Sequence, residues 1–289
     1  MPELPEVETV RRGLSLLVIG KQVGSVSHDT PKGFPNAPGD VDAFLVGATI
    51  TDVRRRAKVL LIDLDTEYTR VIHLKMTGQL VYRGEQVFGA GHPNDSLIGE
   101  LPDRSTRVIF SFTDGSHLYF NDQRKFGWVR LYPTIEVPNI DFMKRVGPEP
   151  LEGELTHTDF IERIRRRNGT TIKAALLDQS VIAGIGNIYA DEALWGARVH
   201  PARRVRDVTD RELSTILDEV RTVLTLSIEK GGSTDKNYVN AEGKRGSYID
   251  FARVFRREGL ACPRHPDVLI EKSRIAGRGT HTCPVCQVE

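Results

Sequence analysis

The 289-residue chain has only three cysteines, and all of them lie near its end, at Cys262, Cys283 and Cys286. A small secreted scaffold held by disulfides needs more, so that class is excluded. No apolar run approaches the roughly 18–20 residues of a membrane span. The first residues are acidic, with Glu3 and Glu6, where a signal peptide would be basic and then apolar. These absences predict a cytoplasmic protein of about two domains.

The chain also lacks an excess of either charge, because 40 Lys and Arg face 39 Asp and Glu. Residues 1–132 carry 16 of each sign, whereas residues 133–155 carry two basic and five acidic side chains. Residues 244–289 carry nine basic and five acidic side chains. This basic tail suits contact with nucleic acid, although a merely solvated surface would have the same composition.

The first half of the chain combines one helix with short β-type runs. Val7, Val10 and Leu14 recur near the helical period, and Gly20 ends the predicted helix. Asp114-Gly115 is a hairpin signal between two of the runs. The predicted strands are Lys58–Asp65, Arg70–Lys75, Gly78–Arg83, Arg107–Phe112, Ser116–Asn121 and Gly127–Tyr132. Short strands without intervening helices favour an antiparallel sandwich.

The second half is predicted to be helical. Four prolines and net acidic charge mark residues 133–153 as a linker. Helices are then expected from Thr156, over Thr171–Asp178 and over Asn187–Ala197, and the pair Thr209 and Glu212 forms a capping box before a long amphipathic helix. We therefore predict an α+β protein with a β-sandwich domain (1–132), a linker (133–153), a helical domain (154–243) and a small C-terminal module (244–289).

The C-terminal module contains a metal-binding pattern. Cys262-x2-His265 and Cys283-x2-Cys286 are two pairs of ligands, each two residues apart, and two such knuckles can complete one tetrahedral shell. Three thiolates and one imidazole suit Zn²⁺, and a full set of protein ligands predicts one structural zinc ion. A tail of free thiols and a site that uses His281 instead of His265 are the alternatives.

The N-terminus offers a nucleophile. Pro2 follows the initiator methionine, whose removal would expose a secondary amine, and an α-amino group titrates near pH ~8. Such an amine can add to an aldehyde-like carbon and form an iminium ion. Glu3 and Glu6 lie close enough in sequence to supply a general acid. The alternative is an ordinary helix start, where proline and acidic residues are favoured.

Motifs spread from residue 2 to residue 287 carry a family resemblance. The chain opens with Met1-Pro2-Glu3-Leu4-Pro5-Glu6. The later motifs are Arg55–Lys58, His73–Gly78, Asn121–Gly127, Gly147–Leu151, Leu176–Gln179, Ile182–Glu192, Gly231–Thr234 and Ala276–Thr280. On these residues the chain resembles bacterial formamidopyrimidine-DNA glycosylases.

The resemblance implies a bifunctional enzyme that removes oxidised purines from duplex DNA after extruding the damaged nucleotide. Pro2 would attack C1′ as the base leaves, Glu3 would be the general acid, and the iminium would permit β- and then δ-elimination. Lys58 resembles the catalytic lysine placed at a phosphate, and Arg278 resembles the arginine that assists the last elimination. In isolation, Lys58 would be interpreted as a lysine at a strand edge.

The same resemblance implies the DNA contacts. Met76, Arg124 and Phe126 resemble the residues that fill the gap left by the base: an apolar plug, a partner for the orphaned base and an aromatic wedge. Met76 and Phe126 could otherwise be ordinary core residues. Glu6, His73, Arg167, Lys173 and Asn187 are the other predicted contacts. Asn187 opens the second helix of the family's helix–two-turns–helix element, and residues 234–248 resemble a cover over the flipped base.

The chain departs from the family pattern at several positions. His265 stands where a fourth cysteine is usual, and Lys75 replaces a glycine. Ser105-Thr106-Arg107 replaces a His-x-His pair, and the glycine-rich segment 88–103 is elongated. No role is assigned to that segment.

Two other functions are considered. An endonuclease VIII-like enzyme for oxidised pyrimidines usually begins Pro-Glu-Gly-Pro, whereas Leu4 stands here. A non-catalytic zinc-finger DNA-binding relative would not need Pro2, Glu3 and Lys58 together. The expectation is a monomeric base-excision repair enzyme that binds damaged double-stranded DNA, has no membrane association and works in the bacterial cytoplasm at the nucleoid.

Overall fold

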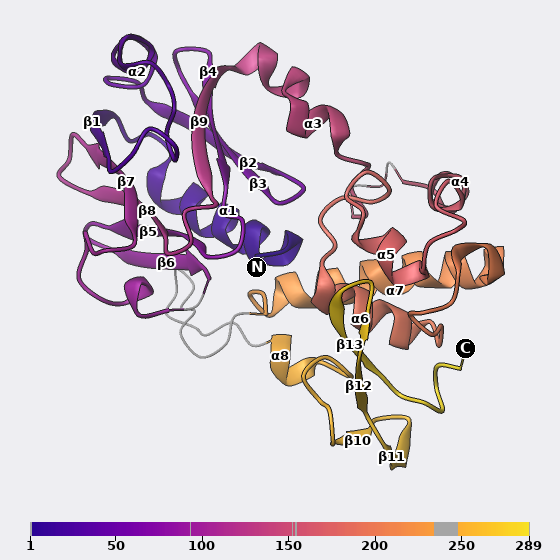
Figure 1. The fold of residues 1–289 in the computed structure, drawn as a ribbon. Coiled ribbons are helices and arrows are strands. Elements are labelled where there is room, and N and C mark those ends of the chain that lie inside the picture. The colour runs from indigo at the N-terminus through magenta and orange to yellow at the C-terminus, as the bar shows by residue number, and fades with distance from the viewer. Residues whose placement is uncertain (1, 93, 152, 154, 234–247, 289) are drawn as a thin grey trace. The chain divides into compact units, whose positions relative to one another are not determined.

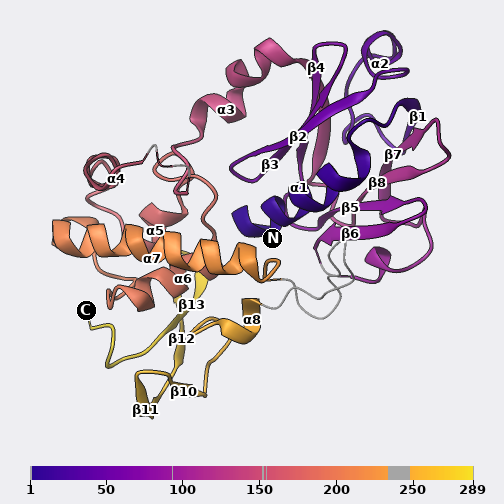
Figure 2. The same ribbon diagram turned by 180° about the vertical axis from the view of Figure 1, so that it is seen from behind.

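The structure is a computed structural model that describes residues 2–92, 94–151, 153, 155–233 and 248–288. Its contacts divide the chain into two compact units, Met1–Lys144 with Lys230–Ser247, and Arg145–Glu229 with Tyr248–Glu289. Both are drawn in Figure 1, and Figure 2 shows them from behind. The predicted linker 133–153 is thus shared between two units, and the four-part division of the chain stays a prediction.

The first unit is built on two antiparallel sheets. The five-stranded sheet has the order β1-β7-β8-β5-β6 and the four-stranded sheet has the order β2-β3-β4-β9. The strands are β1 (Val23–His28), β2 (Ile50–Arg56), β3 (Val59–Leu64), β4 (Tyr68–His73), β5 (Gly78–Arg83), β6 (Val87–Gly91), β7 (Thr106–Phe112), β8 (His117–Asp122) and β9 (Trp128–Pro133). All six predicted strands are present, and the predicted antiparallel sandwich is confirmed.

One apolar core holds this unit together. Ile62 and Ile72 from the four-stranded sheet share a buried cluster with Phe110 and Phe120 from the five-stranded sheet. Helix α1 (Leu4–Val18) adds four fully buried side chains to the same cluster, Val7, Val10, Leu14 and Val18. The N-terminal helix is therefore fixed to the sandwich, and with it the residues at its start. The shorter helices of this unit are α2 (Pro38–Phe44) and α3 (Asp141–Arg145).

The second unit is helical and ends in two β-hairpins. Its helices are α4 (His157–Arg165), α5 (Ile172–Leu177), α6 (Asn187–Gly196), α7 (Asp210–Glu229) and α8 (Tyr248–Phe251). Its strands are β10 (Ala261–Cys262), β11 (His265–Leu269), β12 (Glu271–Ile275) and β13 (Arg278–Thr282). The predicted capping box is confirmed, because Glu212 Oε2 accepts the Thr209 N–H at 2.7 Å and Thr209 Oγ1 accepts the Glu212 N–H at 3.3 Å.

Candidate active site and nucleic-acid interface

The start of α1 presents Pro2 and two buried acids. Glu3 and Glu6 are only 3% and 5% exposed. They form a reciprocal capping box, in which Glu6 Oε2 accepts the Glu3 N–H at 2.8 Å. Glu6 Oε1 accepts the N–H of Ser233 at 2.7 Å. Both oxygens of Glu6 thus hold protein backbone, so Glu6 fixes the N-terminus, and its contact with DNA stays a prediction.

Lys58 lies in the turn between β2 and β3, and it is 6% exposed. The preceding residue, Ala57, has φ of +52°, the left-handed conformation that a tight turn requires. The four-stranded sheet and α1 are joined by an ion pair between Arg55 and Glu8 at 3.2 Å. The chain thus positions the turn that carries Lys58 and the helix that follows Pro2 on the same rigid body.

His73 ends β4 opposite Val59, the residue after Lys58. It is 6% exposed, its ring contacts Trp128 and Phe142, and Nδ1 accepts the Lys75 N–H at 3.1 Å. Burial, with the positive charges of Lys75 and Lys58, lowers the pKa of His73 to about 3. His73 is therefore neutral at physiological pH and shapes the turn that follows it, and its contact with DNA stays a prediction.

Two turns carry Met76, Arg124 and Phe126, and one buried carboxylate holds them together. Asp122 is fully buried, accepts a hydrogen bond from Thr77 Oγ1 and accepts the Gly127 N–H at 2.6 Å. The Arg124 N–H is 3.0 Å from Thr77 Oγ1 and 3.2 Å from Asp122 Oδ1. The network brings the three predicted gap-filling residues onto one locally rigid platform.

Phe126 and Arg124 lie together at the surface of that platform, and their roles in DNA binding stay predictions. Phe126 is 50% exposed, so it is not a core residue, and the Arg124 guanidinium lies 4.8 Å from the centre of its ring. An exposed aromatic ring beside an arginine can stack on a nucleic-acid base. Sequence reasoning missed Asp122, although it sits inside the Asn121–Gly127 motif.

In the second unit, two turns join α5 to α6. The Gln179 side chain spans them, donating to Ile185 O at 2.8 Å and accepting the Gly184 N–H at 3.0 Å. Gly147 packs so closely on this loop that a Cβ atom there would lie 2.7 Å from Ser180 O. The turns are thus held rigidly at the start of α6, where Asn187 stands.

Asn187 and Arg167 remain candidates for phosphate contact. Asn187 Nδ2 donates to Gly279 O at 3.0 Å, and Asn187 begins helix α6, whose positive dipole end favours an anion. Arg167 is paired with Asp178 at 2.8 Å, but its side chain is 42% exposed. Both contacts with DNA stay predictions.

The prediction that Lys173 contacts a phosphate is wrong. Lys173 is fully buried, and its Nζ lies 2.6 Å from Asp191 Oδ1, 2.7 Å from Thr280 Oγ1 and 3.1 Å from Gly279 O. A lysine enclosed in this way cannot reach solvent, and a buried charge needs such a partner. Lys173 instead ties α5 and α6 to strand β13.

The β12–β13 hairpin presents Arg278 at its tip. Ala276 and Gly277 have φ of +51° and +73°, the pattern of a tight hairpin turn, and Arg278 is the exposed residue that follows them. Because Lys173 and Asp191 anchor the other end of β13, the hairpin is fixed to α6. Arg278 is accessible, and its part in catalysis stays a prediction.

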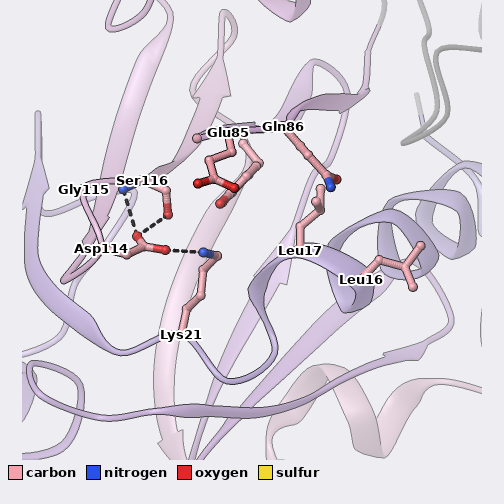
Figure 3. Close-up of a pocket in the computed structure, with 10 residues that line it drawn as sticks. Leu16, Leu17, Lys21, Glu85, Gln86, Asp114, Gly115 and Ser116 are labelled. Atoms are coloured by element: carbon pink, nitrogen blue, oxygen red, sulfur yellow. Dashed lines mark hydrogen bonds and ion pairs between the residues drawn. The ribbon is translucent and has the colours of Figure 1, made fainter.

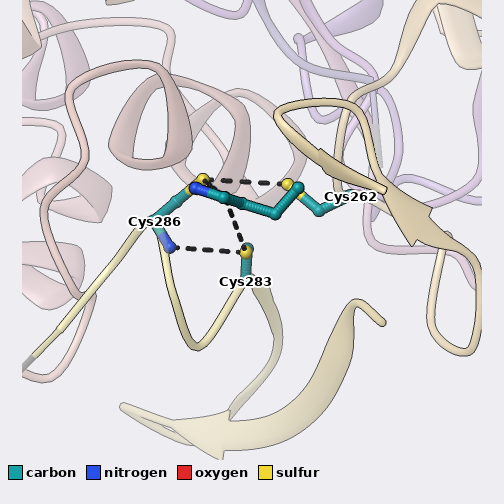
Figure 4. Close-up of side chains that lie close together, drawn as sticks. Cys262, Cys283 and Cys286 are labelled. Carbon is teal, nitrogen blue, oxygen red and sulfur yellow. Dashed lines mark hydrogen bonds between the residues drawn. The ribbon is translucent and has the colours of Figure 1, made fainter. Parts of the chain in front are cut away.

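The predicted metal ligands come together. The ligand atoms of Cys262, His265, Cys283 and Cys286 all lie within 4.8 Å of one another. Figure 4 shows the three cysteines of this set close together. Two sulfurs bound to one tetrahedral zinc ion at about 2.3 Å are about 3.8 Å apart, and the Cys262 and Cys286 sulfurs are 3.7 Å apart. His265 Nδ1 lies 3.1 Å from Cys286 Sγ and 3.9 Å from Cys283 Sγ. The cluster fits a structural zinc ion.

The histidine in the set is His265 and not His281. His281 Nδ1 lies 3.2 Å from Asp191 Oδ2 and its Nε2 lies 3.3 Å from Glu258, so its ring serves the contact between β13 and α6. Burial opposes ionisation of Cys262, but backbone hydrogen bonds from Arg264 and His265, together with the side chains of Cys283 and Trp195, lower the pKa of that thiol to about 6. Such N–H groups are what a zinc knuckle needs to stabilise its thiolates.

Two further residues position this module and were missed by the sequence analysis. Arg264, inside the first knuckle, donates to the carbonyls of Trp195 and Gly196 at 2.7 and 2.9 Å, and so caps the end of α6. Glu192 is fully buried and accepts three backbone N–H groups from residues 253–255. The available signal was the charged pair Asp191-Glu192 inside an otherwise apolar helix.

The predicted cover over the flipped base, residues 234–248, lies outside the described residues except for Tyr248. A hollow of about 470 Å³ is lined by Leu17, Lys21, Tyr82 and Asp114 among others, and Lys21 donates a hydrogen bond to Asp114 there (Figure 3). None of the predicted site residues lines that hollow.

No helix in the described part of the chain is long and apolar enough to span a bilayer.

Known proteins resemble the chain over its full length. Residues 1–129 match the formamidopyrimidine-DNA glycosylase N-terminal domain, and residues 146–238 match the H2TH domain of the same family. Formamidopyrimidine-DNA glycosylase of Pelotomaculum thermopropionicum is 40% identical over 288 residues, 99% of each chain. The same protein of Pediococcus pentosaceus is 42% identical over 288 residues, which cover 100% of this chain and 99% of the relative.

Solved structures agree with the sequence relatives. A mutant of the Lactococcus lactis enzyme, in complex with DNA that contains Fapy-dG, superposes with a TM-score of 0.87 at 31% identity over 100% of both chains. MutM in complex with DNA that contains carbocyclic 8-oxo-G gives a TM-score of 0.85 at 30% identity, again over 100% of both chains. With both domains matched and relatives aligned end to end, the chain belongs to the formamidopyrimidine-DNA glycosylase family.

Proposed function

We propose that this protein excises oxidised purines, 8-oxoguanine and formamidopyrimidines, from duplex DNA and then cleaves the strand at the resulting abasic site. The observation that carries the proposal is the start of α1, where Pro2 precedes two buried glutamates on the body that also holds Lys58. The sequence relatives are named formamidopyrimidine-DNA glycosylase. One structural relative, MutM, was solved in complex with DNA that contains carbocyclic 8-oxo-G.

The proposed chemistry begins once Met1 is removed. The Pro2 nitrogen attacks C1′ of the flipped nucleotide, the bond from C1′ to the base breaks, and Glu3 gives the leaving group its proton. Opening of the sugar ring leaves an iminium between Pro2 and C1′, an electron sink for the next steps.

In the two elimination steps that follow, the proposed role of the protein's cations is to stabilise the phosphates. Loss of the C2′ proton breaks the C3′–O bond, and a second elimination breaks the C5′–O bond. Lys58 is assigned to the phosphate beside the sugar during the first step and Arg278 to the phosphate released in the second, because a cation stabilises the charge that develops there. A zinc ion held by Cys262, His265, Cys283 and Cys286 supplies only fold stability, since the protein fills its coordination shell.

The partner and setting follow from the same proposal. Damaged double-stranded DNA is the substrate, the protein acts as a monomer, and it works in the bacterial cytoplasm at the nucleoid. Met76, Arg124 and Phe126 fill the space that the extruded base leaves, because Asp122 holds them on one platform.

The choice of substrate is tested with paired duplexes. We expect the protein to release 8-oxoguanine opposite cytosine much faster than thymine glycol opposite adenine. It should also cut the lesion strand on both sides of the sugar from which it removes the base. Denaturing gels under single-turnover conditions give both rates. Faster release of thymine glycol would assign the protein to the pyrimidine-specific alternative, and binding without release of either base would favour a non-catalytic DNA-binding protein.

The role of Arg124 gives a second prediction. Replacement of Arg124 by Ala should reduce discrimination between cytosine and the other bases opposite the lesion by about 5- to 150-fold, the worth of one bidentate contact with a base. The measurement is single-turnover excision of 8-oxoguanine opposite each of the four bases. Arg54→Ala, which removes an arginine of the same unit that is paired with Asp63, is the matched control. Equal losses opposite all four bases would refute the role.

A further inference from the structure

A basic groove borders the platform that carries the gap-filling residues. It has a volume of about 470 Å³, and its charged lining residues are Lys32, Lys75, Lys125 and Arg130. No acidic residue lines it. Met76 and Phe126 also line the groove. The groove is therefore continuous with the residues proposed to fill the gap that the extruded base leaves in the duplex.

The positive charge of the groove is largely uncompensated. Across the described ranges, Lys32 and Lys75 have no ion-pair partner. Lys125 has one weak partner, Asp29 at 3.7 Å, and Arg107 holds the same carboxylate at 2.5 Å. The folded protein thus keeps several cations around one concave surface, an arrangement that favours an anion.

Lys75 occupies its position against a conformational preference. Its φ is +51°, a region that glycine adopts freely and a lysine adopts only with strain. The strained backbone is fixed from both sides, because the Lys75 N–H donates to His73 Nδ1 at 3.1 Å and Gly78 N–H donates to Leu74 O at 2.8 Å. Burial lowers the pKa of the Lys75 amine, so a bound anion would stabilise its charged form. A strained, half-buried and unpaired cation in a turn of this kind is best explained by a ligand.

We propose that this groove binds a backbone phosphate of the DNA next to the extrusion site, with Lys75 as its principal contact. The proposal rests on the proposed function, because it takes the ligand to be the duplex that the platform engages. A phosphodiester is favoured over a free small anion because the groove is open and continues into an apolar wall formed by Met76 and the exposed ring of Phe126. Contacts with phosphate carry no sequence information, so the groove should grip undamaged and damaged duplexes alike.

The test compares Lys75→Gln with Lys21→Gln. Both remove one positive charge from the same unit, but Lys21 lies in the hollow of Figure 3, which shares no residue with the groove. The dissociation constant for an undamaged duplex is measured from low to moderate salt. Loss of one phosphate contact should reduce the slope of log K against log salt by about 0.9 and weaken binding several-fold at low salt. Lys21→Gln should leave the slope unchanged.

A second variant separates charge from strain. Lys75→Gly removes the charge and the backbone strain together, so it should lower the salt slope as Lys75→Gln does while raising the melting temperature. Equal slopes for Lys75→Gln, Lys21→Gln and the unsubstituted protein would overturn the proposal, as would a slope restored in Lys75→Gly. Because the assay uses undamaged DNA, it measures phosphate binding by the groove whether or not the protein excises 8-oxoguanine. Excision is measured separately on the lesion duplex.

Discussion

Glu3→Gln is expected to slow release of 8-oxoguanine by about 10²- to 10⁴-fold, the usual contribution of a general acid. Glu3 is 3% exposed at the start of α1, directly after Pro2, and an amide cannot give a proton to the departing base. The variant should cleave a preformed abasic site at a rate much closer to that of the unsubstituted protein, because no base has to leave there. Single-turnover rates on the two substrates measure the difference.

The fold provides the control for this substitution. Glu3 also belongs to the capping box of α1, and the Gln side chain keeps an oxygen that can accept the same backbone N–H. Melting temperatures of the two proteins should therefore agree closely. Comparable decreases in rate on the lesion duplex and on the abasic site would show that the substitution damages the active site in general. Glu3 would then not be the general acid.

Loss of the metal has the second large expected effect. A structural zinc ion contributes on the order of 10 kcal/mol to the module that it folds, which is comparable with the roughly 5–15 kcal/mol stability of a whole domain. His265→Ala should therefore lower the zinc content from one per chain to well below one. It should also weaken binding of duplex DNA strongly, because the cluster closes the module whose hairpin carries Arg278.

Two matched variants assign the ligand. His265→Cys restores a fourth soft ligand at the same position and should keep one zinc per chain. His281→Ala removes the other histidine of the module, whose ring faces Asp191 and Glu258, and should keep its zinc even if stability falls. Zinc content is measured by elemental analysis after dialysis. A full zinc complement in His265→Ala would contradict the assignment.

Local signals in the sequence predicted much of the fold. The capping pair Thr209 and Glu212 marked the start of α7, and alternating apolar residues marked the strands whose inner faces build the core. The strands that escaped prediction have weak patterns for physical reasons. β1 is an edge strand with a single buried residue, β2 ends in three arginines, and β6 contains two glycines. Helix α2 buries none of its residues, so it has no apolar stripe to detect.

Only part of the candidate site could be predicted from local sequence patterns. Spacing was sufficient for the metal ligands, because two knuckles impose their own geometry. It was insufficient for Lys173, whose sequence neighbours do not reveal that Asp191 and Thr280 enclose it. Asp122 was missed for the same reason, since its partners Thr77 and Gly127 come from different turns. Polar groups that act through tertiary contacts are indistinguishable in sequence from polar groups that face solvent.

The identity of the nucleophile is the central claim, and trapping with borohydride tests it most directly. The protein is incubated with an 8-oxoguanine duplex in the presence of borohydride, which reduces an iminium to a stable amine, and the adduct is digested and mapped. We predict one covalent adduct per active chain, located on the nitrogen of Pro2 as the first residue of the mature protein. An adduct on Lys58 or any other lysine, or base release with no adduct, would contradict the account.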